Sequence, residues 1–139
     1  MIKSVIDGIC LAISSKFVDS EIYTEAVKQG LKNGSFLIVC LNPTNTQFLG
    51  RRYFRSNQFC IHYFPKSDEP NSEFIDVLET LQESLELINV NGDLLRGTNM
   101  SSEISEDVLH FFVNYDFFTI RKTDDEYMEQ FDYTSEVKG

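Results

Sequence analysis

The sequence is poor in cationic residues and has no long apolar run. Its 12 Lys and Arg residues stand against 22 Asp and Glu residues, so the formal net charge is −10. Binding of nucleic-acid phosphates requires a cationic surface, and this balance argues against nucleic acid as the main partner. No apolar stretch approaches the roughly 20 residues of a membrane-spanning helix. We therefore expect neither specific nucleic-acid binding nor a membrane partner.

Cysteine is also scarce. Cys10, Cys40 and Cys60 are odd in number and lie far apart in the sequence. They do not suggest a disulfide framework, and we interpret them as free thiols in a reducing compartment. Residues 1–17 carry Lys3 and Asp7 inside an apolar pattern, which is typical of a soluble helix rather than of a leader.

The sequence lacks a recognisable catalytic or metal-binding pattern. Cys60 and His62 share one face of a predicted strand, and Cys40 is expected on a neighbouring strand. A zinc site would need a fourth ligand and a recognisable pair spacing. A Cys–His nucleophile would need an orienting group and an oxyanion pocket. We predict no catalytic, metal-binding or cofactor-binding residues, and we interpret His110 as a hydrogen-bonded structural residue.

The length of 139 residues predicts one domain, and apolar periodicity predicts two helices in it. Steps of three and four residues place one apolar stripe on residues 2–17 and another on residues 69–88. These stripes consist of Ile2, Val5, Ile6, Ile9, Ile13 and Phe17, and of Phe74, Val77, Leu78, Leu81, Leu85 and Ile88.

Apolar residues in strand-like patterns predict the rest of a small α/β domain. We expect an edge strand at residues 21–27, a strand covered on both faces at 36–41, consecutive strands at 50–56 and 58–64, and the longest strand at 108–120. The core face of the longest strand would carry Leu109, Phe111, Val113, Tyr115 and Phe117.

Turn-forming and polar residues separate these elements. Residues 29–34 contain two glycines, and Asn91-Gly92-Asp93 is typical of a tight turn. Residues 42–47 and 97–105 are expected to be polar connections.

Two groups of residues are candidates for subunit contacts. Arg51, Arg52 and Arg55 flank Tyr53 in the first strand of the consecutive pair. The arginines either form ion pairs within or between subunits, remain solvated, or bind a phosphate. The second face of the longest strand mixes Phe with polar side chains, which indicates a part-covered or interface surface. Its members include Phe112, Asn114, Asp116 and Phe118.

The second predicted helix has an acidic face. Like charges three or four residues apart on a helix each cost a few tenths of a kcal/mol. Such a face is either solvated, or meets arginines of a neighbouring subunit, or lines an acidic channel. Its members are Glu69, Glu73, Asp76, Glu79, Glu83 and Glu86.

Three phrases of the sequence resemble a known family. They are LNPTNTQFLGRRYFRSNQFCIHYFP at residues 41–65, GDLLRGTNM at 92–100 and LHFFVNYDFF at 109–118. These segments are similar in sequence to members of the phage tail terminator family found in prophages and phage-like particles of Firmicutes. The resemblance covers residues 2–122, so we expect a domain at 1–122 and an acidic C-terminal arm at 123–139, either mobile or docked on a neighbour.

The resemblance implies an α+β fold in which two amphipathic helices pack on a mixed, largely antiparallel β-sheet. It implies a homo-oligomeric ring, a hexamer, that caps the tail tube as a collar and stops polymerisation of tube protein, and of sheath protein in contractile tails. The ring then joins the head–tail connector or closes a headless, bacteriocin-like particle (a tailocin). Such a structural viral protein is no enzyme and needs no cofactor. It assembles in the host bacterial cytoplasm and ends at the head-proximal end of the tail.

Two alternatives remain open at this point. One is a tail-completion or head–tail joining protein at a neighbouring site of the same particle. The other is a small cytosolic enzyme or ligand-binding domain that uses Cys60, His62 and the arginines. The sequence leaves undecided whether the tail is contractile or flexible, and whether the particle is a phage or headless.

Overall fold

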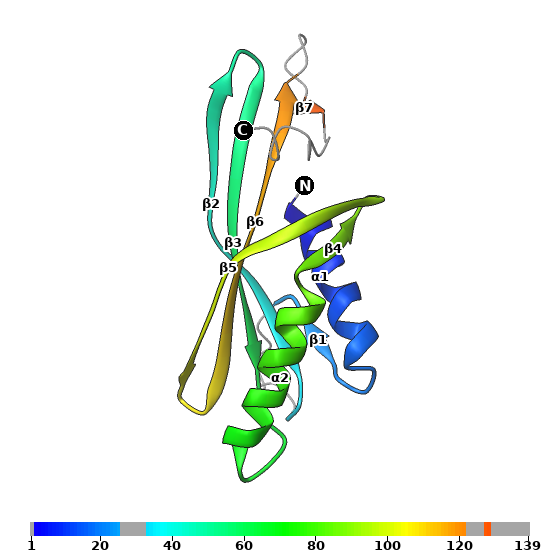
Figure 1. Cartoon of the computed structure of the whole chain (residues 1–139), viewed down its shortest axis with the longest axis vertical. Coiled ribbons are helices and arrows are strands. Elements are labelled where there is room, and N and C mark those ends of the chain that lie inside the picture. Colours follow the sequence, from blue (N-terminus) through cyan, green and yellow to red (C-terminus); the bar gives the residue numbers. More distant parts are fainter. Residues whose placement is uncertain (1, 26–32, 122–126, 129–139) are drawn as a thin grey trace.

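The computed structural model describes residues 2–25, 33–121 and 127–128, which form two helices and a curled sheet (Figure 1). The helices are α1 (Ile2–Lys16) and α2 (Pro70–Ser84). The strands are β1 (Ile22–Tyr23), β2 (Phe36–Leu49), β3 (Arg52–Tyr63), β4 (Leu87–Val90), β5 (Asp93–Ser105), β6 (Val108–Arg121) and β7 (Tyr127–Met128).

The strands pair in the order β1-β2-β3-β6-β5-β4, and β7 pairs with β6. Within the described residues, β1 and β2 are parallel and every other pair is antiparallel. The predicted α+β fold, a mixed and largely antiparallel sheet with two helices, is therefore confirmed. Neither of the described helices is long and apolar enough to cross a membrane.

The core lies between the helices and one face of the sheet. Alternate residues of β3 and β6 point into it, so that Phe59 faces Val113 and Ile61 faces Phe111 across the strand pair. All five residues predicted for the core face of β6 are buried. The helices contribute Val5, Ile9, Ile13, Phe74, Val77 and Leu81. Each large side chain of this kind contributes about 1.5–3 kcal/mol by leaving water.

The second helix ends earlier than its apolar stripe predicted, at Ser84 instead of residue 88. The carbonyl of Leu85 accepts a hydrogen bond from the Tyr115 hydroxyl at 2.6 Å, and that of Glu86 accepts one from the Gly97 amide at 2.8 Å. These carbonyls are therefore bound by β6 and β5 instead of by a further helical turn. Leu85 and Ile88 are buried. The apolar stripe therefore predicted correctly that both residues belong to the core, but wrongly that they belong to the helix.

Gly97 permits this close approach of β5 to the end of α2. A Cβ atom at this position would lie 2.5 Å from the Leu85 carbonyl oxygen and 2.8 Å from Cγ2 of Val113. Both distances are shorter than van der Waals contact, so a larger residue would push β5 away from the helix end.

Two segments predicted as polar connections are strands. Residues 42–47 continue β2, and residues 97–105 form most of β5. Their side chains are mostly exposed, so no apolar alternation marks them. A register shift between Leu41 and Thr44, with Asn42 at φ 42°, accommodates Pro43, which has no N–H for the strand ladder. The two strands predicted at 50–56 and 58–64 are one strand, β3.

The first strands differ from the prediction in extent. The strand predicted at residues 21–27 is a short edge element, β1, because Thr24 and Glu25 form a bend and residues 26–27 lie outside the described chain. In β2, Phe36 and Ile38 are buried whereas Leu37 and Val39 are only half-buried. The prediction of a strand covered on both faces is therefore wrong in part, because the helices cover one face of the sheet (Figure 1).

The predicted turns are confirmed where the structure describes them. Asn91 and Gly92 have φ values of 54° and 89° and connect β4 to β5 in a two-residue turn. Gly34, at φ 79°, belongs to the turn predicted at residues 29–34, of which residues 29–32 lie outside the described chain. The arm predicted at 123–139 also lies outside it, except for the backbone of β7.

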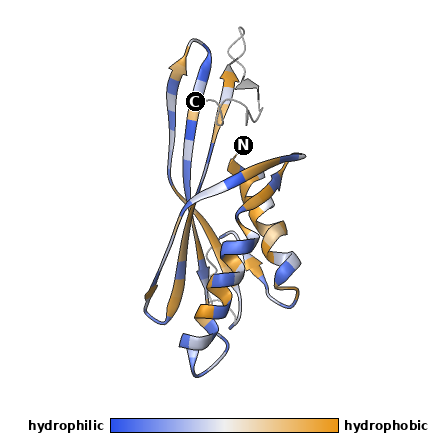
Figure 2. Cartoon of the chain, in the orientation of Figure 1, coloured by the Kyte–Doolittle hydropathy of each residue, from blue (hydrophilic) through white to orange (hydrophobic). Residues whose placement is uncertain are grey.

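The adjacent strands β2, β3 and β6 run past the helices (Figure 1). Residues 42–57 and 116–121 form this extension, which we call the protruding half; the remainder of these strands belongs to the helix-covered half. Figure 2 shows hydrophilic and hydrophobic residues intermixed along the protruding half, whereas the helices turn apolar residues toward the sheet.

Candidate functional site

One face of the protruding half carries what we call the aromatic–arginine cluster, formed by Phe48, Arg52, Phe54 and Phe118. The centroid of the Phe118 ring lies 5.2 Å from that of Phe48 and 5.1 Å from that of Phe54. The guanidinium carbon of Arg52 lies 4.8 Å from the same centroid, which is within cation–π range. The cluster therefore joins three strands and combines apolar area with positive charge.

The arginines do not converge on one point. Arg52 and Arg55 lie on opposite faces of β3, as the alternation predicts, because the guanidinium of Arg55 lies over Phe117, 5.7 Å from its centroid. Tyr53 shares the face of Arg55, and Arg51 is exposed in the turn between β2 and β3. A single phosphate would have no three-arginine clamp here, so the arrangement favours several separate contacts with a protein surface.

The other predicted interface residues continue along the face of Phe118. Phe112, Asn114 and Asp116 are half-buried on β6. Oδ1 of Asp116 accepts a hydrogen bond of 3.2 Å from the backbone amide of Asn57. Oδ1 of Asn114 is buried and has no hydrogen-bond partner within the described residues. An unsatisfied buried acceptor of this kind costs about 1–3 kcal/mol.

The predicted acidic helix face is partly used within the chain. The carboxylate of Glu73 accepts hydrogen bonds from the Tyr63 hydroxyl and from the backbone amides of Lys66 and Ser67, the latter two at 2.8 and 2.9 Å. Partial burial acts to raise the pKa of Glu73, but these hydrogen bonds prevail and lower it. Glu73 thus fastens the segment after β3 to the first turn of α2.

The remaining acids of this face point to solvent. Glu86 follows α2 and forms an ion pair with Arg96 at 3.3 Å, in which both side chains are more than half exposed. Exposed pairs of this kind contribute about 0–1 kcal/mol. The other exposed members are Glu69, Asp76, Glu79 and Glu83. They remain available for a partner or for a solvated channel wall.

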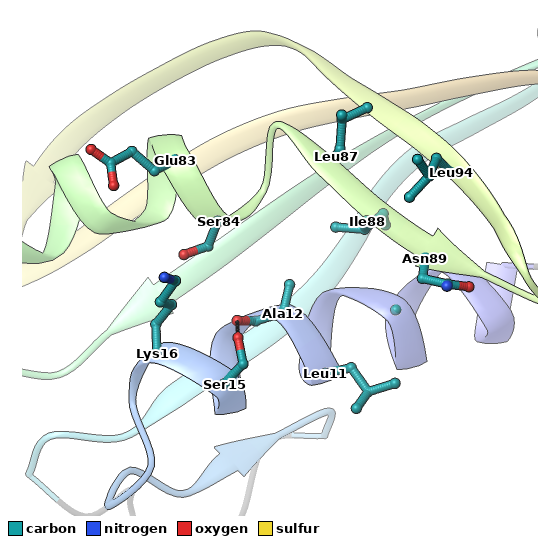
Figure 3. A pocket seen from close by; sticks show the side chains of 11 residues that line it. Leu11, Ala12, Ser15, Lys16, Glu83, Ser84, Leu87, Ile88, Asn89 and Leu94 are labelled. Atoms are coloured by element: carbon teal, nitrogen blue, oxygen red, sulfur yellow. Dashed lines mark hydrogen bonds between the residues drawn. The ribbon is translucent and has the colours of Figure 1, made fainter.

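An open groove of about 490 Å³ lies between α1, the end of α2 and the β4–β5 hairpin (Figure 3). Leu11 of α1, Leu87 of β4 and Leu94 of β5 line it, and all three are exposed. Glu83 and Lys16 also line the groove. Three exposed leucines around one depression form an apolar surface of the kind that binds a partner.

Cys60, His62 and His110 meet on the sheet face that points away from the helices. Their potential ligand atoms all lie within 4.8 Å of one another, and Sγ of Cys60 lies 4.0 Å from Nδ1 of His110. Cys40 lies on the neighbouring strand, as predicted, but it pairs with Phe59 and packs against the core on the other face.

The Cys60 thiol is not activated by this cluster. Burial, with a smaller contribution from the charge of Glu103, raises the pKa of Cys60 to about 11. A nucleophilic cysteine requires a lowered pKa, because the thiolate is the reactive form. The arrangement therefore does not favour a Cys–His nucleophile.

The sequence prediction missed several residues that the fold brings into these surfaces. Phe48 and Phe54 were not among the predicted interface residues, because their contacts with Phe118 depend on the pairing of β3 with both β2 and β6. His110 was interpreted as structural, because its proximity to His62 follows only from the pairing of β3 with β6. Leu11, Leu87 and Leu94 come from three elements, and no local pattern connects them.

Comparison with protein families decides what these surfaces belong to. The family model described as "Phage tail terminator protein" matches residues 4–127. The chain belongs to the phage tail terminator family. No curated protein matches the chain.

The family match confirms the resemblance of the three phrases, all of which lie inside the matched residues. As a tail terminator, the protein is a structural component of a phage tail and acts with other tail components. The aromatic–arginine cluster, the acidic helix face and the apolar groove remain candidate surfaces for those contacts.

Proposed function

We propose that this tail terminator closes into a homo-oligomeric ring, a hexamer, at the head-proximal end of the tail. There it caps the tube and stops polymerisation of tube protein, and of sheath protein where the tail is contractile. The ring then offers the surface that joins the head–tail connector or closes a headless particle. The observation that carries this proposal is a pair of complementary surfaces at separate places on one chain.

The first surface is the tip of the β2–β3 hairpin. Phe48 is 58% exposed and Leu49 is 70% exposed, although both are large apolar residues. Arg51 is exposed in the adjoining turn. The tip is thus apolar and cationic, and it lies at one end of the long axis, away from both helices (Figure 1).

The second surface is the groove beside α1. Its leucines are exposed, Leu11 by 68%. Glu83 lines the groove, and Glu79 lies one turn earlier on the exposed side of α2. A tip that is apolar and cationic therefore matches an apolar groove that has Glu83 beside Lys16 in its lining and Glu79 near it on α2. We infer that the tip of one subunit enters the groove of the next.

Contact between two different surfaces of identical chains produces a head-to-tail assembly. Such a heterologous interface closes into a ring when the rotation between neighbours divides the circle. We take the six-fold symmetry from what the family resemblance implies. The acidic net charge suits a ring through which DNA passes without adhering, since like charges repel. The role is structural, with assembly in the host bacterial cytoplasm.

Tail length tests the capping role directly. Particles made with and without this protein should be compared by electron microscopy. Overlong tubes of variable length in its absence are the expected result. Tails of normal length that fail to join heads would assign the protein to head–tail joining instead, and complete particles of normal length would contradict both roles.

Charge reversal tests the contact between subunits. The variant Arg51→Glu/Arg52→Glu/Arg55→Glu should remain a folded monomer but fail to form rings, as measured by native mass spectrometry and circular dichroism. Combining it with Glu79→Arg/Glu83→Arg should restore assembly in part, because the sign of both surfaces is then exchanged. Rings formed by the triple variant alone would refute the arginine contact.

The acidic face has a second possible role, and one variant separates the two. Glu79→Lys/Glu83→Lys/Glu86→Lys should block ring formation if this face meets the arginines of a neighbour. If the face lines the lumen, the same variant should form normal rings and tails but slow the passage of DNA in a phage.

A further inference from the structure

The centre of the sheet carries a cluster of metal-ligating side chains that the assembly role does not use. Cys60 and His62 are two residues apart on β3, so they project from the same face. His110 is the direct cross-strand partner of His62 on β6. Two ligands at alternate positions of one strand and a third on its neighbour can converge on one point above the sheet.

The spacing of the donor atoms suits a small cation. Tetrahedral zinc with Zn–S of about 2.3 Å and Zn–N of about 2.0–2.1 Å holds its ligand atoms about 3.3–3.6 Å apart. The three donors lie within 4.8 Å of one another, and Sγ of Cys60 lies 4.0 Å from Nδ1 of His110. Small side-chain rotations therefore bring all three donors to bonding distance, without movement of the strands.

We propose that Cys60, His62 and His110 bind one Zn²⁺ ion on the sheet face opposite the helices. One thiolate and two imidazoles form a donor set that zinc prefers among the common divalent ions. Three protein ligands leave a fourth position for water or for a carboxylate. Glu103 is placed for that position, because it is the cross-strand partner of His110 on β5 and lies on the same face.

The protonation states of the free site agree with this use. Burial, and then the proximity of His110, lower the pKa of His62, so its imidazole is neutral and able to bind metal at neutral pH. Burial raises the pKa of Cys60, so the ion must displace a proton from the thiol. Zinc binding is therefore expected to release a proton and to weaken as the pH falls.

The bound ion would join β3 to β6 within the helix-covered half, one residue pair from the end of their pairing at Tyr63 and Leu109. It would thus hold together the end of this strand pair that lies away from the protruding half. This role is independent of ring formation, and its test requires no other tail protein.

Cobalt substitution tests the site in the full-length protein. Metal-free protein titrated with Co²⁺ should show one ion per chain, with the intense near-ultraviolet absorption of a thiolate–cobalt bond and visible bands of tetrahedral coordination. Added Zn²⁺ should displace the cobalt and abolish both signals. Absence of the thiolate band, or bands of octahedral cobalt alone, would overturn the proposal.

Matched variants identify the ligands. His62→Asn and His110→Asn should each weaken zinc binding more than about 100-fold, because even outer-shell partners contribute about 10–100-fold. Both histidines are only half-buried, so these variants should fold, which circular dichroism without metal can verify. Cys60→Ser should abolish the thiolate band, whereas Cys10→Ser and Cys40→Ser should leave it unchanged. Wild-type affinity in both histidine variants would exclude this site.

Discussion

The same three strands, β2, β3 and β6, serve two different purposes along their length. In the helix-covered half, one face is a continuous core in which Phe59, Phe111 and Tyr115 are fully buried. In the protruding half, Phe48 remains at the surface, and Phe117 and Phe118 are buried beside arginines instead of beneath helices. We therefore expect the helix-covered half to contribute most of the stability, and the exposed tip of the protruding half to contact other chains.

The sharpest test of this comparison replaces one phenylalanine in each half. Phe59→Ala should lower the free energy of unfolding by about 3–5 kcal/mol, because it leaves a cavity in a close-packed core. Phe48→Ala should change it by only about 0.5 kcal/mol, as is usual for an exposed position, yet it should weaken assembly. Urea denaturation measures the first effect, and native mass spectrometry the second.

A third variant serves as a control in case Phe59→Ala fails to fold. Phe59→Leu keeps most of the volume and should remain folded with a smaller loss of stability. If Phe48→Ala destabilised the monomer as strongly as Phe59→Ala, the protruding half would be a second core, and the division of roles would be wrong.

Glycine substitutions distinguish the halves by mechanism. Gly97→Ala should cost about 1–3 kcal/mol, because the added Cβ collides with the Leu85 carbonyl and Val113. Gly50, in the hairpin turn of the protruding half, has φ 58° and open space around it, so Gly50→Ala should cost about 1–2 kcal/mol through backbone strain alone. Thermal unfolding measures both.

Substitution by asparagine distinguishes steric collision from backbone strain. Because Asn tolerates the left-handed conformation, Gly50→Asn should recover much of the stability lost in Gly50→Ala. Gly97→Asn should be at least as unstable as Gly97→Ala. Recovery at both positions would mean that β5 does not need its close approach to the end of α2.

The smallest expected effect concerns acid. The folded-state pKa of Glu73 lies below its ordinary value of 4.5. Its ionised form therefore stabilises the fold above that pH, and this contribution is lost as the pH falls from 4.5 through the folded-state pKa. Urea midpoints should fall less between neutral and acidic pH in Glu73→Gln than in the wild type. Glu79→Gln, at an exposed position of α2, should behave as the wild type; equal acid sensitivity in all three would remove Glu73 from this role.

Sequence pattern predicted the parts of the fold that have one buried face. The stripe from Ile2 to Ile13 and the alternation from Leu109 to Phe117 correspond to α1 and β6, because burial selects apolar residues at the period of each structure. Residues 42–47 and 97–105 escaped prediction because both faces of these strands are largely exposed, and backbone pairing alone leaves no such pattern. Leu85 and Ile88 made the predicted second helix too long. Both are buried at helical spacing, although Leu85 caps α2 and Ile88 belongs to β4.

The candidate surfaces were harder to predict from the sequence than the fold. The arginines and the second face of β6 were recognised from local composition, and the structure brings Arg52 and Phe118 into contact. The groove and the Cys60–His62–His110 cluster depend on residues from separate elements. Only the pairing of β3 with β6, about 50 residues apart in sequence, places His110 beside His62.

The position of β6 in the sheet also has a consequence for synthesis on the ribosome. β6 lies between β3 and β5, although it is made after both of them. Until residue 121 has left the exit tunnel, the nascent β2–β3 hairpin has an unpaired edge and exposes Phe59 and Ile61. Unpaired edges and exposed apolar strands favour aggregation. The chain is therefore expected to need chaperone protection until β6 has been made and pairs with β3.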